Sequence, residues 1–141
     1  EGVAIMQYIG DRKLESKLVP PAGTIERYRV IEWLNYLTSE VHKSFSPLFN
    51  PNAAPEVKAY TTANLEKKLD WTNDQLAGSK YLTGETFTVA DAYLFTLINW
   101  TYFVGIDLGK WPALKEFHGR VAARPKVQEA LEAEGLNKRA A

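Results

Sequence analysis

The sequence contains no cysteine among its 141 residues and only two histidines, His42 and His118. A chain without cysteine forms no disulfide, offers no thiolate to a metal and has no cysteine nucleophile of its own. Two histidines far apart in the sequence are too few for a typical zinc site. We therefore expect no metal, and any thiol chemistry must come from another molecule or domain.

The chain also lacks an excess of charge of either sign, because 17 Lys and Arg residues balance 17 Asp and Glu residues. Without a net positive field we expect no nucleic-acid partner. The longest uncharged apolar stretch, residues 92–106, is too short and too polar to cross a bilayer, so no membrane partner is expected either. A hydrophobic content of 45% is typical of a globular chain, and we expect a soluble, cytoplasmic protein.

No initiating methionine precedes Glu1, and no basic segment followed by an apolar run is present at this end. The start is therefore not a targeting segment. We expect the chain to be a piece of a longer protein.

Helical periodicity dominates the sequence, and no stretch shows a convincing alternation of period two. We predict an all-α fold of five to six helices around a buried central helix. The predicted helices cover residues 3–9, 24 to 42 or beyond, 56–76, 89–104 and 112–123, with a short one from 125. Pro47 and the cluster at 50–52 are expected to close the second of them. Gly10 is expected to end the first helix in the left-handed conformation. Residues 11–23, charged and then proline-bearing, are expected to form a connector.

The second predicted helix has two different faces. Its apolar face is spaced by three or four residues and comprises Val30, Leu34, Leu37, Val41, Phe45 and Leu48. Its opposite face is unusually rich in hydrogen-bonding groups and comprises Asn35, Ser39, His42 and Ser46. One face therefore belongs to the core, and the other is available to a polar ligand.

The fourth predicted helix, 89–104, carries Asp91 as its only charge, and this composition predicts the central position. Thr88 and Asp91 have the spacing of a capping box, in which each residue satisfies the other's backbone amide. We interpret the pair as a structural cap. The alternative, a catalytic carboxylate at Asp91, has no second acid or histidine nearby in the sequence.

Two interpretations are open for His42 and for the aromatic residues. A lone histidine on a helix is usually solvated or satisfied, whereas a functional His42 would hydrogen-bond a ligand or tune a nucleophile. The aromatic residues Phe45, Phe49 and Trp100 either belong to the core or form the wall of an apolar pocket beside His42. We interpret His118 as structural. No glycine-rich phosphate loop, paired metal-binding acids or Ser/His/Asp set is present.

Several segments carry a resemblance beyond these patterns: EGVAIMQYI at 1–9, EVHK at 40–43, FTVADA at 87–92 and RPKVQ at 124–128. Together they resemble a bacterial glutathione transferase of the beta class over essentially the whole chain. The capping segment alone indicates the wider superfamily, whereas the polar residues of the second helix indicate the beta class. The resemblance implies that residues 1–12 are the last helix of a truncated thioredoxin-like domain. Residues 13–23 would then be a linker and 24–141 an all-helical C-terminal domain, in a homodimer.

The resemblance also implies roles for individual residues. Those expected to contact glutathione are Glu1, Gly2, Asn35, Ser39, Glu40, His42 and Lys43. Glu1 and Gly2 would hold the γ-glutamyl end, although the family often has serine at the second position. Asn35, Ser39 and Glu40 would reach the neighbouring subunit's glutathione. His42 would hydrogen-bond the catalytic thiol of the absent domain, and Phe45, Phe49 and Trp100 would line the acceptor pocket.

The implied function is conjugation of the glutathione thiol to electrophilic apolar substrates, a detoxification reaction with glutathione as cosubstrate. We expect this chain alone to be inactive, because the resemblance assigns the thiol-bearing part to the absent domain. Two alternatives remain open. One is a non-catalytic interaction module with the same helical fold, and the other is a glutathione-dependent thiol or peroxide reductase.

Overall fold

The computed structural model describes residues 1–136, and this part of the chain is all-α. Its helices are α1 (Gly2–Asp11), α2 (Ile25–Tyr36), the π-helical η2 (Leu37–His42), α3 (Lys43–Phe49), α4 (Pro55–Leu76), α5 (Val89–Phe103), α6 (Pro112–Ala122) and α7 (Pro125–Ala133). Two short 3₁₀ turns are η1 (Leu14–Ser16) and η3 (Leu108–Lys110). In residues 1–136 the β-structure is limited to a single bridge between Tyr81 and Gly84. The predicted fold class is confirmed.

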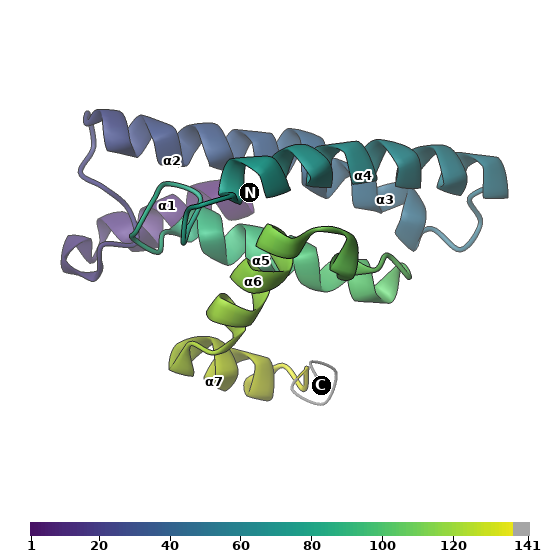
Figure 1. The fold of residues 1–141 in the computed structure, drawn as a ribbon. Helices are drawn as coiled ribbons and strands as arrows, with labels where there is room; N and C mark the ends of the chain where they lie inside the picture. Colours follow the sequence, from purple (N-terminus) through teal and green to yellow (C-terminus); the bar gives the residue numbers. More distant parts are fainter. Residues whose placement is uncertain (137–141) are drawn as a thin grey trace.

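The helices form a layered bundle, as Figure 1 shows. α2, η2 and α3 follow one another as a nearly continuous rod, and α4 returns antiparallel beside it (Figure 1). α5 lies beneath this pair, α6 packs against both α4 and α5, and α7 extends from α6 (Figure 1). No helix in residues 1–136 combines the length and apolar character needed to cross a membrane.

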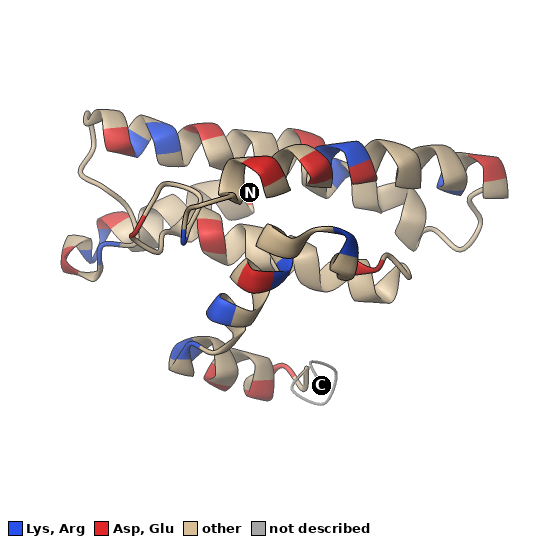
Figure 2. Ribbon diagram, viewed as in Figure 1, with Lys and Arg blue, Asp and Glu red and all other residues tan. Residues whose placement is uncertain are grey.

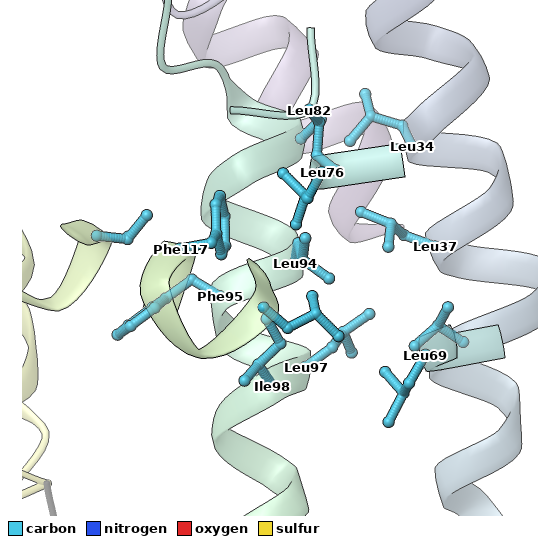
Figure 3. Packing of buried hydrophobic residues seen from close by; sticks show 14 of the residues in the cluster. Leu34, Leu37, Leu69, Leu76, Leu82, Leu94, Phe95, Leu97, Ile98 and Phe117 are labelled. Carbon is cyan, nitrogen blue, oxygen red and sulfur yellow. The ribbon is translucent and has the colours of Figure 1, made fainter. Parts of the chain in front are cut away.

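The core is centred on α5, as the composition of that helix predicts. Asp91 is the only charged residue of α5, and most of this helix is tan in Figure 2. In Figure 3 apolar side chains from α5 point toward those of the surrounding helices and the loop before α5; the labelled ones are Leu34, Leu37, Leu69, Leu76, Leu82, Leu94, Phe95, Leu97, Ile98 and Phe117. Burial of α5 is not complete, because Thr96 and the last-turn residues Tyr102 and Phe103 are exposed.

Several helix ends follow the local sequence signals. The Thr24 side chain accepts a hydrogen bond from the backbone N–H of Arg27 at 3.2 Å, which caps α2. Gly105 follows α5 with a φ of +72°. The next residue, Ile106, donates its N–H to the Thr101 carbonyl at 3.0 Å. The left-handed glycine therefore lets the chain turn back and provide a donor for a carbonyl oxygen of the last turn.

The prediction that Gly10 ends the first helix is wrong. α1 continues to Asp11, and Gly10 is a buried residue inside it with no positive φ. A Cβ atom built on Gly10 would lie 2.7 Å from both Cγ atoms of Val19, which is itself buried. Glycine at this position therefore permits close packing between α1 and the connector rather than a turn.

The second helix is not uniformly α-helical as predicted, because residues 37–42 form a π-helical segment. A π segment widens the turn and changes the direction of the side chains that follow it. Leu37, Val41 and Phe45 all remain buried across the change. His42 is the last residue of the π segment, so this distortion sets the direction in which its imidazole leaves the helix.

Candidate functional site

The buried cap at the start of α5 is a closed network. Oδ2 of Asp91 accepts hydrogen bonds from the Thr88 N–H at 2.8 Å and from the Thr88 hydroxyl at 2.9 Å. Oδ1 accepts from the Leu82 N–H at 2.8 Å, and the capping box is formed. Burial raises the pKa of Asp91, while the donors of Leu82 and Thr88 act in the opposite direction. Both carboxylate oxygens are occupied, which favours the structural interpretation.

The imidazole of His42 is held from one side by α5. Its Nδ1 lies 2.6 Å from the Tyr93 hydroxyl oxygen, and its ring meets Trp100 edge to face with centroids 4.8 Å apart. Tyr93 and Trp100 are seven residues apart and therefore share one face of α5. Nε2 of His42 has no hydrogen-bond partner within residues 1–136, and the side chain is half-buried. This nitrogen is the part of the ring available to a ligand.

The three predicted pocket residues lie together, and one of them, Trp100, contacts the His42 ring. Phe45 is buried, and its ring is 5.5 Å from that of Trp100. Phe49 is half-exposed and lies 5.6 Å from Trp100 and 6.1 Å from Phe45, centroid to centroid. The rings fill much of the space between themselves. The arrangement gives a partly exposed apolar surface beside the imidazole, with Phe49 at its outer edge.

Four of the polar residues predicted to contact glutathione lie on the exposed side of α2, η2 and the start of α3. Asn35, Ser39, Glu40 and Lys43 are exposed. Ser39 donates its hydroxyl proton to Glu40 Oε1 at 3.3 Å. The Glu40 carboxylate lies 3.1 Å from the Lys68 ammonium on α4, and this contact lowers the pKa of Glu40. Glu40 is therefore engaged within the chain, while Asn35 and Lys43 extend into solvent.

Glu1 and Gly2 lie at the start of α1. The Glu1 side chain is exposed and does not cap the helix, although its carbonyl oxygen accepts from the N–H groups of Ala4 and Ile5. A Cβ atom on Gly2 would meet nothing within 4 Å, so a serine would fit there. The carboxylate of Glu1 and the first N–H groups of α1 are therefore both available at this end.

A separate cavity of about 550 Å³ opens between α4 and the α2–α3 rod. Its lining comprises Tyr36, Ser44, Thr61, Asn64, Lys67, Lys68 and Trp71. The Tyr36 and Trp71 rings lie 4.6 Å apart, and Lys68 donates to Ser44 Oγ at 3.0 Å. None of the residues around His42 lines this cavity, so it belongs to a different face of the molecule.

Sequence reasoning did not identify Tyr93, the residue that contacts His42 directly. The available signal was its spacing of seven residues from Trp100, which places both on one face of α5. Sequence reasoning also did not identify Lys68 of α4, whose ammonium group bonds both the side chain and the carbonyl oxygen of Glu40 on η2. Residues 1–136 hold no cluster of three His, Asp or Glu residues arranged to bind a metal.

Comparisons with known proteins agree with this fold. The family described as glutathione S-transferase, C-terminal domain, matches residues 36–125. The glutathione S-transferase GstA of Escherichia coli O157:H7 is 48% identical over 136 residues, which cover 96% of this chain and 68% of that protein.

Two solved structures share the fold closely. One is the beta class glutathione S-transferase of Sphingomonas chungbukensis, with 43% identity and a TM-score of 0.93. The other is a sphingomonad glutathione S-transferase in complex with glutathione, with 42% identity and a TM-score of 0.93. Each match covers 96% of this chain and 68% of the other.

The chain therefore belongs to the glutathione S-transferase family, and its fold is that of the family's C-terminal domain. Within the family it belongs with the bacterial beta class, as the sequence resemblance implies.

Proposed function

We propose that this chain supplies the acceptor pocket and part of the glutathione site of an enzyme that conjugates the glutathione thiol to electrophilic apolar substrates. The observation that carries the proposal is the His42 imidazole, half-buried among aromatic rings with Nε2 unpartnered within residues 1–136. A donor at this place can stabilise a thiolate. The adjoining rings of Phe49 and Trp100 offer an apolar surface to a flat electrophile.

The glutathione contacts we propose follow the exposed polar residues of α2, η2 and the start of α3. Asn35 and Lys43 extend into solvent, and Ser39 and Glu40 lie between them in the sequence. A charged tripeptide needs donors and acceptors along its length, and this face provides both. Glu1 and Gly2 would hold the γ-glutamyl end at the start of α1. The sphingomonad relative that was solved with glutathione supports this ligand class.

We propose that residues 1–12 belong to a preceding thioredoxin-like domain and that residues 13–23 link it to residues 24–141. Support comes from α1, whose side chains Ile5, Tyr8 and Ile9 are more than half exposed. Such a contiguous apolar surface is unusual in a monomeric protein and fits a domain interface. The preceding domain would bring the catalytic thiol group close to His42, so the 141-residue chain alone would be inactive.

A homodimer is part of the same proposal. The outer sides of α2 and α4 expose large apolar side chains, namely Ile25, Tyr28, Val57, Tyr60 and Trp71. A second copy would cover this surface and bring Asn35 and Ser39 near the neighbouring subunit's glutathione. We place the enzyme in the cytoplasm, where reduced glutathione is abundant, and assign it a detoxifying role.

The test is a conjugation assay with glutathione and a chromogenic chloronitrobenzene. We expect turnover from the longer protein that carries the preceding domain, and no turnover above buffer from the 141-residue chain. Turnover by the chain alone would overturn the expected inactivity, and a longer protein without turnover would overturn the proposed reaction.

His42→Ala in the longer protein tests the assigned site. We expect kcat/KM to fall roughly tenfold, because the thiolate loses one hydrogen-bond donor. The matched control is Lys115→Ala, which alters an exposed residue on α6. Equal rates for His42→Ala and the control would remove His42 from the site.

A further inference from the structure

We infer that Tyr93 is a positioning residue that holds His42 as the Nε2–H tautomer, so that the imidazole acts as a hydrogen-bond donor toward the ligand sulfur and not as a base. The 2.6 Å contact between Nδ1 and the Tyr93 hydroxyl oxygen carries this inference. That His42 donates to the glutathione sulfur rests on the proposed function. The assignment of the His42 tautomer does not.

The direction of the hydrogen bond follows from the chemistry of the two groups. A phenol hydroxyl is a stronger donor than a neutral imidazole N–H, and a bare imidazole nitrogen is a better acceptor than a phenol oxygen. In a neutral pair the proton between them therefore belongs to Tyr93. The short separation also fits a hydroxyl donor, since N–H donors typically lie about 2.9 to 3.0 Å from their acceptors.

A third group supports the same direction. The Thr38 hydroxyl lies 3.5 Å from the Tyr93 hydroxyl oxygen, at the far limit of a hydrogen bond. If Thr38 donates to Tyr93, the tyrosine oxygen is an acceptor on that side and directs its own proton to His42. Thr38, Tyr93 and His42 then form a chain of donors that ends at Nδ1.

The ring of His42 is restrained in orientation as well as in tautomer. The Trp100 ring meets the His42 ring edge to face at an interplanar angle of 85°. Trp100 and Tyr93, which makes the hydrogen bond, lie on the same face of α5. With Nδ1 accepting from Tyr93, the ring proton must be on Nε2. The Nε2–H group can donate a hydrogen bond to a thiolate, which has already lost its proton. The same nitrogen cannot accept a proton from a thiol.

The tautomer is measured directly by a long-range ¹H–¹⁵N correlation spectrum of the ¹⁵N-labelled 141-residue chain, at about pH 8 where imidazoles are neutral. We expect the His42 pattern of a protonated Nε2 and a bare Nδ1. His118 is an internal reference, because its Nε2 lies 2.7 Å from Asn99 Oδ1 and must donate to it. A protonated Nδ1 at His42 would overturn the inference.

Tyr93→Phe removes the hydroxyl while preserving the ring. We expect the two His42 nitrogen signals to move toward each other, as they do when both tautomers exchange, while the His118 signals stay fixed. Tyr102→Phe is the matched control, since Tyr102 lies on the same helix with an exposed side chain. Unchanged His42 signals in Tyr93→Phe would show that Tyr93 does not select the tautomer.

The same variants in the longer protein separate this inference from the proposed function. We expect Tyr93→Phe to lower kcat about 3- to 10-fold, which is the loss expected for one hydrogen bond. The KM for glutathione should change little. Tyr102→Phe should have the same kcat and KM as the parent. A parent without conjugation activity would remove the proposed function and leave the tautomer result intact. An active parent whose rate is unaffected by Tyr93→Phe would remove the positioning role.

Discussion

α5 contacts two polar side chains in opposite ways. At its start, the Asp91 carboxylate is fully buried and accepts from Leu82 and Thr88 with both oxygens. Further along, His42 meets Tyr93 and Trp100 with one ring nitrogen bonded and the other unpartnered within residues 1–136. The first arrangement leaves nothing for a ligand to bind, and the second leaves a donor at the edge of an aromatic surface.

This difference distinguishes a saturated polar group on α5 from a half-exposed one on η2 that α5 holds from one side. A buried polar group without partners is costly, so a saturated one indicates a role in stability. A half-exposed group held rigidly on one side and unpaired on the other is arranged for a partner from outside. We call the first region the anchor (Thr88–Asp91 with Gly10, Val19 and Leu82) and the second the His42 site (His42, Tyr93, Trp100 and Phe49).

Asp91→Ala is expected to have the largest effect on stability. The change leaves the N–H groups of Leu82 and Thr88 without their acceptor and removes the cap, at a cost of about 3 kcal/mol. Urea unfolding of the chain measures the loss. The control is Asp74→Ala on α4, an exposed acidic residue. A loss for Asp91→Ala no greater than for Asp74→Ala would mean that the anchor is not a stabilising unit.

Gly10→Ala tests the other side of the anchor. The new methyl group would overlap the buried side chain of Val19. Val19 cannot move away easily, because the carbonyl oxygen of its neighbour Leu18 accepts a hydrogen bond from the Val89 N–H at 2.9 Å. Overpacking costs about 1 to 3 kcal/mol, whereas alanine gains up to about 1 kcal/mol over glycine in a helix. We expect a net loss of about 1 to 2 kcal/mol by urea unfolding. Gly119→Ala on α6, where a Cβ meets nothing within 4 Å, should be neutral or stabilising.

Gly10 also illustrates where sequence reasoning failed. The all-α class, the approximate helix positions, the apolar faces and the capping box follow from neighbours within about four residues, and these predictions agree with the structure. The role of Gly10 depends on Val19, which approaches it through the fold of the connector. A glycine near a helix end has the same local sequence whether it turns the chain or permits close packing.

The His42 site could be predicted only in part for a related reason. The polar face of the second helix and its aromatic neighbours were visible in the spacing of Asn35, Ser39, His42 and Phe45. The π segment at 37–42 has no clear sequence signal, and it sets the direction of His42. The contact with Tyr93 joins residues 51 positions apart, so it becomes visible only when α5 packs against η2.

His42→Ala is expected to reduce stability much less than Asp91→Ala and somewhat less than Gly10→Ala. The side chain is half-buried and contributes one hydrogen bond, so we expect a loss of about 1 kcal/mol or less in the free energy of unfolding. Urea unfolding next to Asp91→Ala gives the direct comparison. A loss as large as that of Asp91→Ala would make His42 a structural residue and remove the distinction between the two regions.

The smallest expected effect is the pH dependence that the Asp91 carboxyl group adds to stability, and Asp91→Asn isolates it because asparagine does not ionise. The amide NH2 group also replaces one of the two acceptor oxygens, so the pH dependence and not the absolute loss is compared. Burial raises the pKa of Asp91 in the folded chain, so the folded state holds this proton to higher pH than the unfolded state does. Its contribution to stability is then fully present below the unfolded pKa and is lost as the pH rises through the folded one.

Asp11 and Glu40, whose pKa values are lowered by Arg27 and Lys68, change stability in the opposite direction, because their contribution is lost as the pH falls. The parent chain and Asp91→Asn both contain Asp11 and Glu40. The contributions of these two groups therefore cancel when the unfolding free energy of one protein is subtracted from that of the other. We expect the stability of the parent relative to Asp91→Asn to decline as the pH rises through the acid range, measured by urea unfolding at several pH values. A relative stability that increases over this range would mean that the donors of Leu82 and Thr88 outweigh burial and hold Asp91 ionised.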